Sequence, residues 1–442
     1  MNLKRFLIFV FLFVILTCIA LIFLRTLGPK YEKKSAKTVF ISKNENTYQL
    51  IRNGSPFTIR GAAGNSNFEL LSSINGNTIR LYDTINLTEK LNEAQKFNLA
   101  VIVDIPIPAF SDKYSVYDDP IFVADLKKKV QVLVNKTKQH PALLFWNLGN
   151  ELKYPLVFKK NNFINTFNEL IQIIHEADVN HPIATTISGT DYKQVSSLYL
   201  HSPELDFISY NIFAHLKKVK KYLTAIEVVF GERPYYISEW GPNGHWEGAI
   251  TPWGAPYENS TTTNIKEVKE RYQIIKNNYN KGCLGSLYFY WGSKQEVTHT
   301  WFSLFNSQNK SEIIKVLASL WRKSTFEPKT TVIESILLND DTKNEKNIVL
   351  PEHLQTAELL MKNYISGNQE ISWEIYPEDW HYPANNKNYA FTKINATIVP
   401  ISNSKIQFIS PKDEGAYRLF VYVVDKEGYY ATANAPFYVL KK

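Results

Sequence analysis

The fold is decided by a stretch in the middle of the chain, LLFWNLGNE at residues 143–151, in which a short apolar run ends in a carboxylate. A run of this length and composition is typical of a buried strand. Seven similar segments, rich in β-branched and aromatic residues, lie on either side of it. The predicted strands are Thr58–Gly61, Thr78–Tyr82, Leu99–Ile105, Leu143–Leu148, Ile183–Ser188, Phe207–Asn211, Tyr235–Ser238 and Ser286–Tyr290.

The segments between these strands have the spacing of amphipathic helices. Phe163, Phe167 and Ile171 fall on one helical face, and residues 120–138 and 265–279 behave in the same way. Eight strands, each followed by a helix, over about 270 residues predict a (β/α)8 TIM barrel of the α/β class. A doubly wound parallel sheet is the alternative, but no glycine-rich phosphate fingerprint follows the first strand.

The sequence pattern changes after Pro328, where strand patterns occur without helical ones. The predicted strands are Val332–Leu338, Ile371–Tyr376, Lys405–Ile409, Tyr417–Val424 and Tyr430–Val439. Turn-rich segments separate them, and together they predict a small all-β immunoglobulin-like sandwich. We expect Trp373 and Trp380 to cover its core and edges rather than to form a platform for a sugar.

The first residues of the chain are of another kind. Phe6–Leu24 is apolar except for Thr17 and is long enough, as a helix, to cross a bilayer. It is longer than the core of a signal peptide and no small-residue cleavage pattern follows it, while the residues before Cys18 make a poor lipoprotein signal. We therefore predict an N-terminal transmembrane helix. The expected domains are an anchor at 1–27, a barrel at 45–327 and the sandwich at 328–442.

Composition excludes several classes of function. The 442 residues carry a net charge of +8, but the cations are spread along the chain rather than gathered in the stripe that nucleic-acid binding needs. Two cysteines, Cys18 and Cys283, cannot build a disulfide framework or a multi-cysteine zinc site within one chain. No HExxH pattern is present. We expect no nucleic-acid partner, no metal and no cofactor.

Two glutamates follow predicted strands of the barrel. Glu151 comes directly after strand four, and Glu239 closes strand seven in the stretch YYISEWG at residues 235–241. Catalytic groups of such barrels lie where strands end, and these two strands face each other across the barrel mouth. A pair of solvated strand-end carboxylates is the alternative interpretation. Two carboxylates at this place are the equipment for cleaving a glycosidic bond.

The two motifs also resemble those of a known family. NLGNE at 147–151 and ISEWG at 237–241 are similar to the acid/base and nucleophile motifs of clan A glycoside hydrolases, with glycoside hydrolase family 2 the nearest match. The likeness covers the barrel, from YQLIRNGSPF at 48–57 and RGAAG at 60–64 to YWG at 290–292. The chain departs from family 2 in leaving no room between anchor and barrel for N-terminal sugar-binding sandwiches, so the likeness implies little about the substrate.

The resemblance implies roles for individual residues. Glu151 corresponds to the general acid/base and Glu239 to the nucleophile, while Asn150 is placed to hydrogen-bond the sugar 2-hydroxyl. Arg80 ends strand two, where the clan carries an arginine that keeps the nucleophile ionised. A structural salt bridge from Arg80 to Asp83 or Asp104 is the alternative for that residue.

Strand six supplies a further expected contact and a departure from the clan. Asn211 matches the clan's strand-end asparagine. Phe213 stands where many relatives carry a tyrosine that contacts the nucleophile, so the resemblance leaves that contact unassigned. Tyr210 could replace it only if the strand register shifts.

Aromatic residues beyond strands seven and eight are candidates for sugar contacts. Trp291 closes strand eight, where the clan commonly offers an aromatic platform, and Trp246 and His245 follow strand seven. Indole rings pack against the C–H faces of sugars, although core packing is the alternative for each tryptophan. His215 and His299 are further candidates to line the cleft.

These observations predict a membrane-anchored glycoside hydrolase that cleaves O-glycosidic, β-configured bonds of an oligo- or polysaccharide with retention, by double displacement. A transglycosidase acting on a β-glucan-type polysaccharide would use the same intermediate. A non-catalytic carbohydrate-binding envelope protein and a metal-dependent hydrolase are the other classes, but the paired glutamates disfavour the former and the missing histidine and aspartate cluster the latter. An extracytoplasmic position of the catalytic part is assumed.

Overall fold

A computed structural model describes residues 3–45, 47–111, 113, 115–279, 281–324, 327–340, 347–362, 368–378 and 392–441. The chain forms two compact units. The first comprises residues 1–240 and 274–288, and the second comprises residues 241–273 and 289–442. Trp380 lies outside the described residues.

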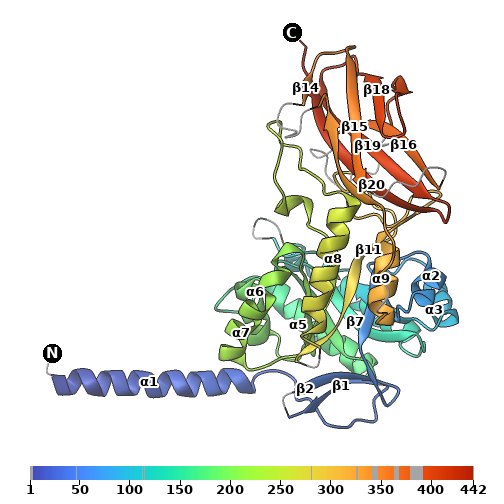
Figure 1. The fold of residues 1–442 in the computed structure, drawn as a ribbon. Coiled ribbons are helices and arrows are strands. Elements are labelled where there is room, and N and C mark those ends of the chain that lie inside the picture. Colours follow the sequence, from blue (N-terminus) through green and yellow to red (C-terminus); the bar gives the residue numbers. More distant parts are fainter. Residues whose placement is uncertain are drawn as a thin grey trace. The chain divides into compact units, whose positions relative to one another are not determined.

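The first unit is built around a closed barrel of parallel strands, which confirms the predicted architecture and excludes the doubly wound sheet (Figure 1). Around the barrel the strands follow chain order, and the last pairs with the first. Their bounds differ from the predicted ones by a few residues. The strands are β4 (Ile59–Gly64), β5 (Thr78–Leu81), β6 (Ala100–Ile105), β7 (Leu143–Asn150), β8 (Ile183–Ser188), β9 (Phe207–Asn211), β10 (Tyr235–Trp240) and β11 (Cys283–Trp291).

A helix follows each strand of the barrel, as predicted. The helices are α2 (Phe68–Ser73), α3 (Leu87–Lys96), α4 (Pro120–Thr137), α5 (Asn162–Ala177), α6 (Tyr192–His201), α7 (Val219–Phe230), α8 (Thr261–Lys276) and α9 (Ile313–Arg322). Short 3-10 turns lie at η1 (Val116–Asp118), η2 (Ala214–Lys218) and η3 (His245–Glu247). Helix α5 shows how the sequence forms these elements, since Asn161 caps its first turn and its apolar face is buried.

An antiparallel sheet that the sequence analysis did not predict closes the N-terminal end of the barrel. It consists of β1 (Val39–Asn44), β2 (Thr47–Arg52) and β3 (Ser55–Phe57). Val39, Ile41, Tyr48 and Leu50 share one hydrophobic core with residues near the starts of barrel strands, among them Ile59, Ala100 and Phe207. The apolar interior of the barrel is thereby sealed from water at this end.

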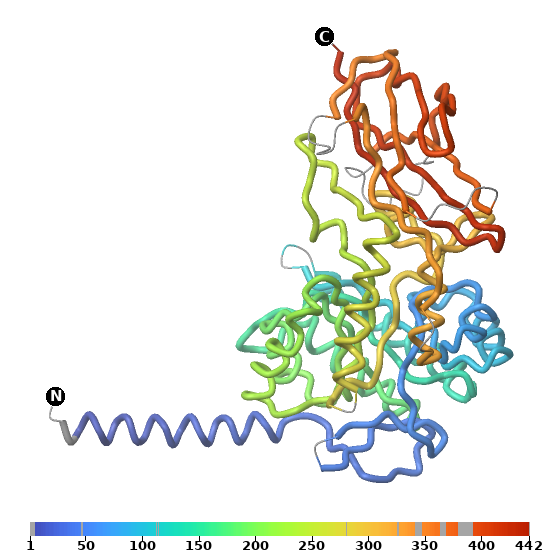
Figure 2. The backbone as a smooth tube through the Cα atoms, in the orientation of Figure 1, coloured from blue at the N-terminus to red at the C-terminus, as the bar shows by residue number. Residues whose placement is uncertain are grey.

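Helix α1 (Leu3–Thr26) precedes this sheet, and Figure 2 traces the path from one to the other. Among the described residues, α1 is the helix long and apolar enough to cross a membrane, and its span Arg5–Thr26 is not buried against the rest of the chain. Its end is fixed to α7: Arg25 Nη2 donates to the Val228 carbonyl over 2.9 Å, and Arg233 donates to the Leu27 carbonyl.

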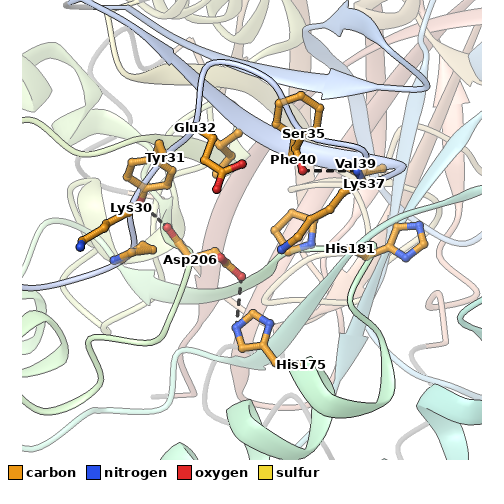
Figure 3. Close-up of a pocket in the computed structure, with 13 residues that line it drawn as sticks. Lys30, Tyr31, Glu32, Ser35, Lys37, Val39, Phe40, His175, His181 and Asp206 are labelled. Atoms are coloured by element: carbon orange, nitrogen blue, oxygen red, sulfur yellow. Dashed lines mark hydrogen bonds and ion pairs between the residues drawn. The ribbon is translucent and has the colours of Figure 1, made fainter.

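A cavity of about 120 Å³ lies between the segment after α1 and the N-terminal ends of the barrel strands (Figure 3). Tyr31 donates its hydroxyl hydrogen to the Asp206 carbonyl over 2.5 Å, and His175 Nε2 lies 3.4 Å from the Asp206 carboxylate. Burial raises the pKa of Asp206, against the influence of His175. These contacts hold the segment between α1 and β1 to the N-terminal end of the barrel, opposite to the end with Glu151 and Glu239.

The second unit contains two sheets. One orders β12 (Lys310–Ser311), β20 (Tyr429–Val439), β19 (Gly415–Asp425) and β16 (Gln369–Pro377), with β14 (Ile348–Val349) on β20. The other orders β13 (Val332–Leu338), β15 (Leu354–Lys362), β18 (Lys405–Ile409) and β17 (Ile398–Pro400). Both contribute to one core, and Trp373 packs against it as predicted. The strands β12, β14, β15 and β17 were not predicted from the sequence.

A buried ion network fixes the loop after β10 to these sheets and explains why residues 241–273 belong to the second unit. Arg418 Nε donates to Glu378 over 2.8 Å, and Arg418 Nη2 donates to the Pro256 carbonyl over 2.6 Å. Burial raises the pKa of Glu258, whose carboxylate lies 3.8 Å from Arg418 and accepts from Thr298. The loop is therefore tied to the sheets by charged as well as neutral contacts.

Candidate active site

Arg80, at the end of β5, lies at the centre of the candidate site. Its side chain is wholly buried and makes a bidentate contact with Asp104 on β6, with Nε–Oδ1 at 2.9 Å and Nη2–Oδ2 at 2.7 Å. Burial alone would lower the pKa of Arg80, but the Asp104 carboxylate outweighs it and the pKa is raised. The predicted alternative partner Asp83 pairs with Lys90 instead. Arg80 is thus both a member of a structural salt bridge and a neighbour of Glu239.

Glu239 lies on β10 and is 7% exposed. Its Oε1 accepts a hydrogen bond of 2.8 Å from the Tyr82 hydroxyl and lies 3.4 Å from Arg80 Nη1. The pairing of β10 with β9 is irregular between Ile237 and Glu239. Such an irregularity redirects a side chain at the rim of a barrel. One oxygen of the Glu239 carboxylate therefore has both a cation and a hydroxyl donor beside it.

Glu151 follows β7 directly and has a left-handed backbone, with φ of 51°. Its N–H donates to the Thr186 carbonyl over 3.0 Å, and its Oε1 accepts from Asn211 Nδ2 over 2.8 Å. Gly149, with φ of 74°, allows the turn before it, because an added Cβ would lie 2.5 Å from the Leu152 side chain. The sequence NLGNE thus turns Glu151 out of the strand and toward Asn211.

Two asparagines connect the glutamates. Asn150 Oδ1 accepts from Arg80 Nη2 over 2.8 Å and from Asn211 Nδ2 over 3.2 Å. Asn211 Oδ1 accepts from Ser238 over 2.8 Å. The structure therefore brings five predicted residues together: Glu151, Glu239, Arg80, Asn150 and Asn211. Contact of Asn150 with a sugar hydroxyl stays a prediction.

Tyr82 is a member of this cluster that the sequence analysis missed. It stands two residues after Arg80, and alternate residues of a strand share a face, so this spacing was the available signal. Tyr210, the tyrosine considered earlier as a contact for the nucleophile, packs instead against Tyr235 with ring centroids 5.7 Å apart. Phe213 is buried and offers no hydroxyl.

The aromatic candidates after β10 and β11 belong to the second unit. Trp291 is 0% exposed and its ring lies edge-on to Phe305, with centroids 5.3 Å apart. Contrary to the prediction of an open platform, Trp291 is a core residue, because a strand-end position does not tell whether later chain covers the indole. His299 is likewise packed, between Tyr376 and Phe420, and burial lowers its pKa to about 4.

Trp246 and His245 are more open to solvent. Trp246 is 57% exposed and its ring lies 4.8 Å from that of His245. His245 Nε2 lies 3.3 Å from Glu296. Burial alone would raise the pKa of Glu296, but His245 and Lys294 outweigh it and the pKa is lowered. Contact of Trp246 and His245 with a saccharide stays a prediction.

Comparisons with known proteins agree with the barrel fold. The model for the TIM barrel domain of the glycosyl hydrolases family 2 matches residues 74–252. A β-D-glucuronidase from Dictyoglomus thermophilum is 16% identical with a TM-score of 0.50, over 66% of this chain and 55% of its own. No curated protein matches the sequence.

Two further solved structures are similar at lower scores. The endo-β-1,4-mannanase from Thermotoga petrophila is 13% identical with a TM-score of 0.42, over 88% of this chain and 99% of its own. The β-glucuronidase 2 from Bacteroides uniformis is 12% identical with a TM-score of 0.49, over 91% of this chain and 48% of its own. The chain thus spans about half the length of these two glucuronidases.

The different burial of two tryptophans leads to a testable contrast. We expect Trp291→Ala to lower the free energy of unfolding by about 3–5 kcal/mol, because it removes a wholly buried indole. Trp246→Ala should change it by less than about 0.5 kcal/mol, since most of that ring is in water. Urea unfolding of both variants measures the difference. A Trp291→Ala variant as stable as the parent would contradict its placement in the core.

Proposed function

We propose that the protein, whose barrel matches the model of the family 2 TIM barrel domain over residues 74–252, cleaves β-configured O-glycosidic bonds of an oligo- or polysaccharide with retention of configuration. The observation that carries the proposal is the hydrogen-bonded cluster around Arg80. It holds Glu239 on one side and, through Asn211, Glu151 on the other. Two carboxylates with different partners at one barrel mouth suit a double displacement.

The partners of the two carboxylates suggest unequal roles. Glu239 lies beside the Arg80 cation and accepts from Tyr82, so its charged form is favoured and it acts as the nucleophile on the anomeric carbon. Glu151 accepts from the neutral amide of Asn211. It gives a proton to the departing oxygen and then takes one from the attacking water.

The proposed retention requires the shorter of two separations between the carboxyl groups. Retaining enzymes hold the two groups about 5–5.5 Å apart, and inverting enzymes about 6.5–9.5 Å apart to admit a water. Glu239 pairs in register with Asn211 on the neighbouring strand β9, and the Asn211 amide contacts Glu151. Glu151 therefore contacts the side chain of Asn211, whose backbone pairs with that of Glu239.

We also propose that α1 anchors the enzyme in a membrane and that the barrel lies on the extracytoplasmic side. The support is the apolar span Arg5–Thr26, which as a helix of 22 residues is about 33 Å long. The contacts of Arg25 and Leu27 with α7 and Arg233 would place the barrel close to the bilayer surface. Protease accessibility in intact cells tests the orientation.

The glutamate pair gives the most specific test of the proposed function. Glu239→Ala should abolish turnover of every substrate. Glu151→Ala should lose about 10²- to 10⁴-fold on poor leaving groups, because the general acid is missing, and much less on activated aryl glycosides. Added azide should rescue Glu151→Ala and give a β-glycosyl azide, which NMR of the product identifies.

The control for this pair is Glu69→Ala, which removes an exposed carboxylate on α2 and should leave the kinetics unchanged. An α-glycosyl azide from Glu151→Ala would rule out retention. Equal activity of Glu239→Ala and the parent would rule out the proposed function itself. Transfer of the sugar to a saccharide acceptor in place of water would identify a transglycosidase with the same intermediate.

The anchor has its own test. Deletion of residues 1–27 should move the protein from the membrane fraction to the soluble fraction, because α1 is the candidate membrane span among the described residues. Carbonate extraction of membranes that hold either form measures the change. A truncated form that still requires detergent would show a second membrane contact and contradict the single anchor.

A further inference from the structure

We infer that Tyr82 is a positioning residue for Glu239 and that its hydroxyl promotes the second half of the reaction, in which the sugar leaves Glu239. The inference rests on the proposed function, since it needs Glu239 to be the nucleophile. Tyr82 follows β5 directly and supplies the hydroxyl that Phe213, after β9, lacks. The inference begins from two contacts with the same carboxylate oxygen.

The Tyr82 hydroxyl makes the shorter of those two contacts. It donates to Glu239 Oε1 over 2.8 Å, whereas Arg80 Nη1 lies 3.4 Å from that oxygen. Arg80 makes its short contacts with Asp104 and Asn150 instead, at 2.7 and 2.8 Å. The cation therefore acts on Glu239 mainly through its charge, while Tyr82 supplies the short directional hydrogen bond.

The phenol ring is held in place by the same cation. Arg80 Cζ lies 4.7 Å from the centroid of the Tyr82 ring, within the range of a cation–π contact. The bidentate contact with Asp104 fixes the guanidinium plane in turn. Tyr82 thus stands on a rigid support that extends from β6 to β10, and its hydroxyl has a defined direction toward Oε1.

Tyr82 remains a hydrogen donor under the conditions in which the enzyme works. Burial and the neighbouring Glu239 carboxylate both raise the pKa of Tyr82 above that of a free phenol, against the influence of Arg80. The hydroxyl therefore keeps its hydrogen while Glu239 changes between carboxylate and ester. The strength of its hydrogen bond therefore changes with the charge of Glu239, while the hydroxyl itself stays protonated.

The charge on Glu239 changes in opposite directions in the two halves of the reaction. In the first, a carboxylate electron pair forms the bond to the anomeric carbon, and the leaving oxygen departs with its bonding pair and takes the proton of Glu151. In the second, Glu151 takes a proton from water, the water oxygen bonds to that carbon, and the ester bond breaks with its electron pair returning to Glu239. Negative charge is lost in the first step and restored in the second.

A hydrogen bond to a charged acceptor is stronger than one to a neutral acceptor. The Tyr82 contact therefore weakens as the ester forms and strengthens as the ester breaks. It makes Glu239 a better leaving group in the second half. Without the hydroxyl, the covalent intermediate should accumulate.

The experiment uses Tyr82→Phe in the full chain in detergent, with an activated aryl β-glycoside that the parent hydrolyses. We expect kcat to fall about 10- to 100-fold, as for loss of one hydrogen bond to a charged group. KM should fall with it, because the intermediate builds up, and stopped flow should show a burst of released phenol. The acidic limb of kcat/KM should move to higher pH, since the hydroxyl no longer favours the Glu239 carboxylate.

The matched control is Tyr48→Phe. Tyr48 is a buried tyrosine whose hydroxyl also donates over 2.8 Å, but to the Glu232 carbonyl at the other end of the barrel. Its loss should affect stability and leave kcat, KM and the pH profile unchanged. Equal melting temperatures of Tyr82→Phe and the parent would confirm that the kinetic change is not unfolding.

Parent values of kcat, with no burst and no shift of the acidic limb, would overturn the inference. A fall in kcat/KM with an unchanged KM and no burst would overturn it as well, because that result assigns Tyr82 to the first half. If Glu239→Ala keeps full activity, the proposed function fails instead, and the two failures are therefore distinguishable.

Discussion

The buried pair of Arg80 and Asp104 is the interaction on which the candidate site depends. A guanidinium that is 0% exposed is stable only if its charge is balanced and its donors are occupied. Asp104 supplies the balance, and Asn150, Thr186 and Glu239 lie around the remaining donors. One side chain from β5 thus connects β6, β7, β8 and β10 at the end of the barrel where the glutamates emerge. The Arg80–Asp104 contact therefore belongs both to the packing of the barrel and to the charges of the candidate site.

The two ends of the barrel differ in their side chains and in their role. At the N-terminal end, the sheet β1–β3 seals the interior with apolar side chains, and the linker from α1 is fixed by Tyr31 and Asp206. At the C-terminal end, polar groups are buried in the strands themselves, and the strand pairing is irregular beside Asn150 and Glu239. The apolar seal and the charged groups therefore lie at opposite ends of the barrel.

Much of the barrel could be predicted because its strands are short apolar runs between helical patterns. Glu151 and Glu239 could be found because a carboxylate directly after an apolar run is costly to place unless it has a partner or a function. Trp291 could not be placed, because its burial depends on Phe305, which comes later in the chain. The sheet β1–β3 was missed because it pairs only locally and lies outside the repeating pattern of strand and helix.

Tyr82 was missed for a different reason. Arg80 could be predicted because it ends a strand, whereas Tyr82 could be predicted only because it shares a face with Arg80, two residues earlier. Phe213 follows β9 at the place where the resemblance implies a tyrosine, and Tyr210 on β9 packs against Tyr235. Phe213 could not indicate that the tyrosine contact comes from Tyr82, because Tyr82 follows a different strand.

The most direct test of the account is the identity of the residue that becomes bonded to sugar. An inactivator that forms a stable glycosyl ester, such as a 2-deoxy-2-fluoro β-glycoside with an activated leaving group, traps that residue for peptide mapping by mass spectrometry. We predict one labelled site, Glu239, and no label in Glu239→Ala. A label on Glu151, or turnover of the unfluorinated glycoside with no residue labelled, would contradict it.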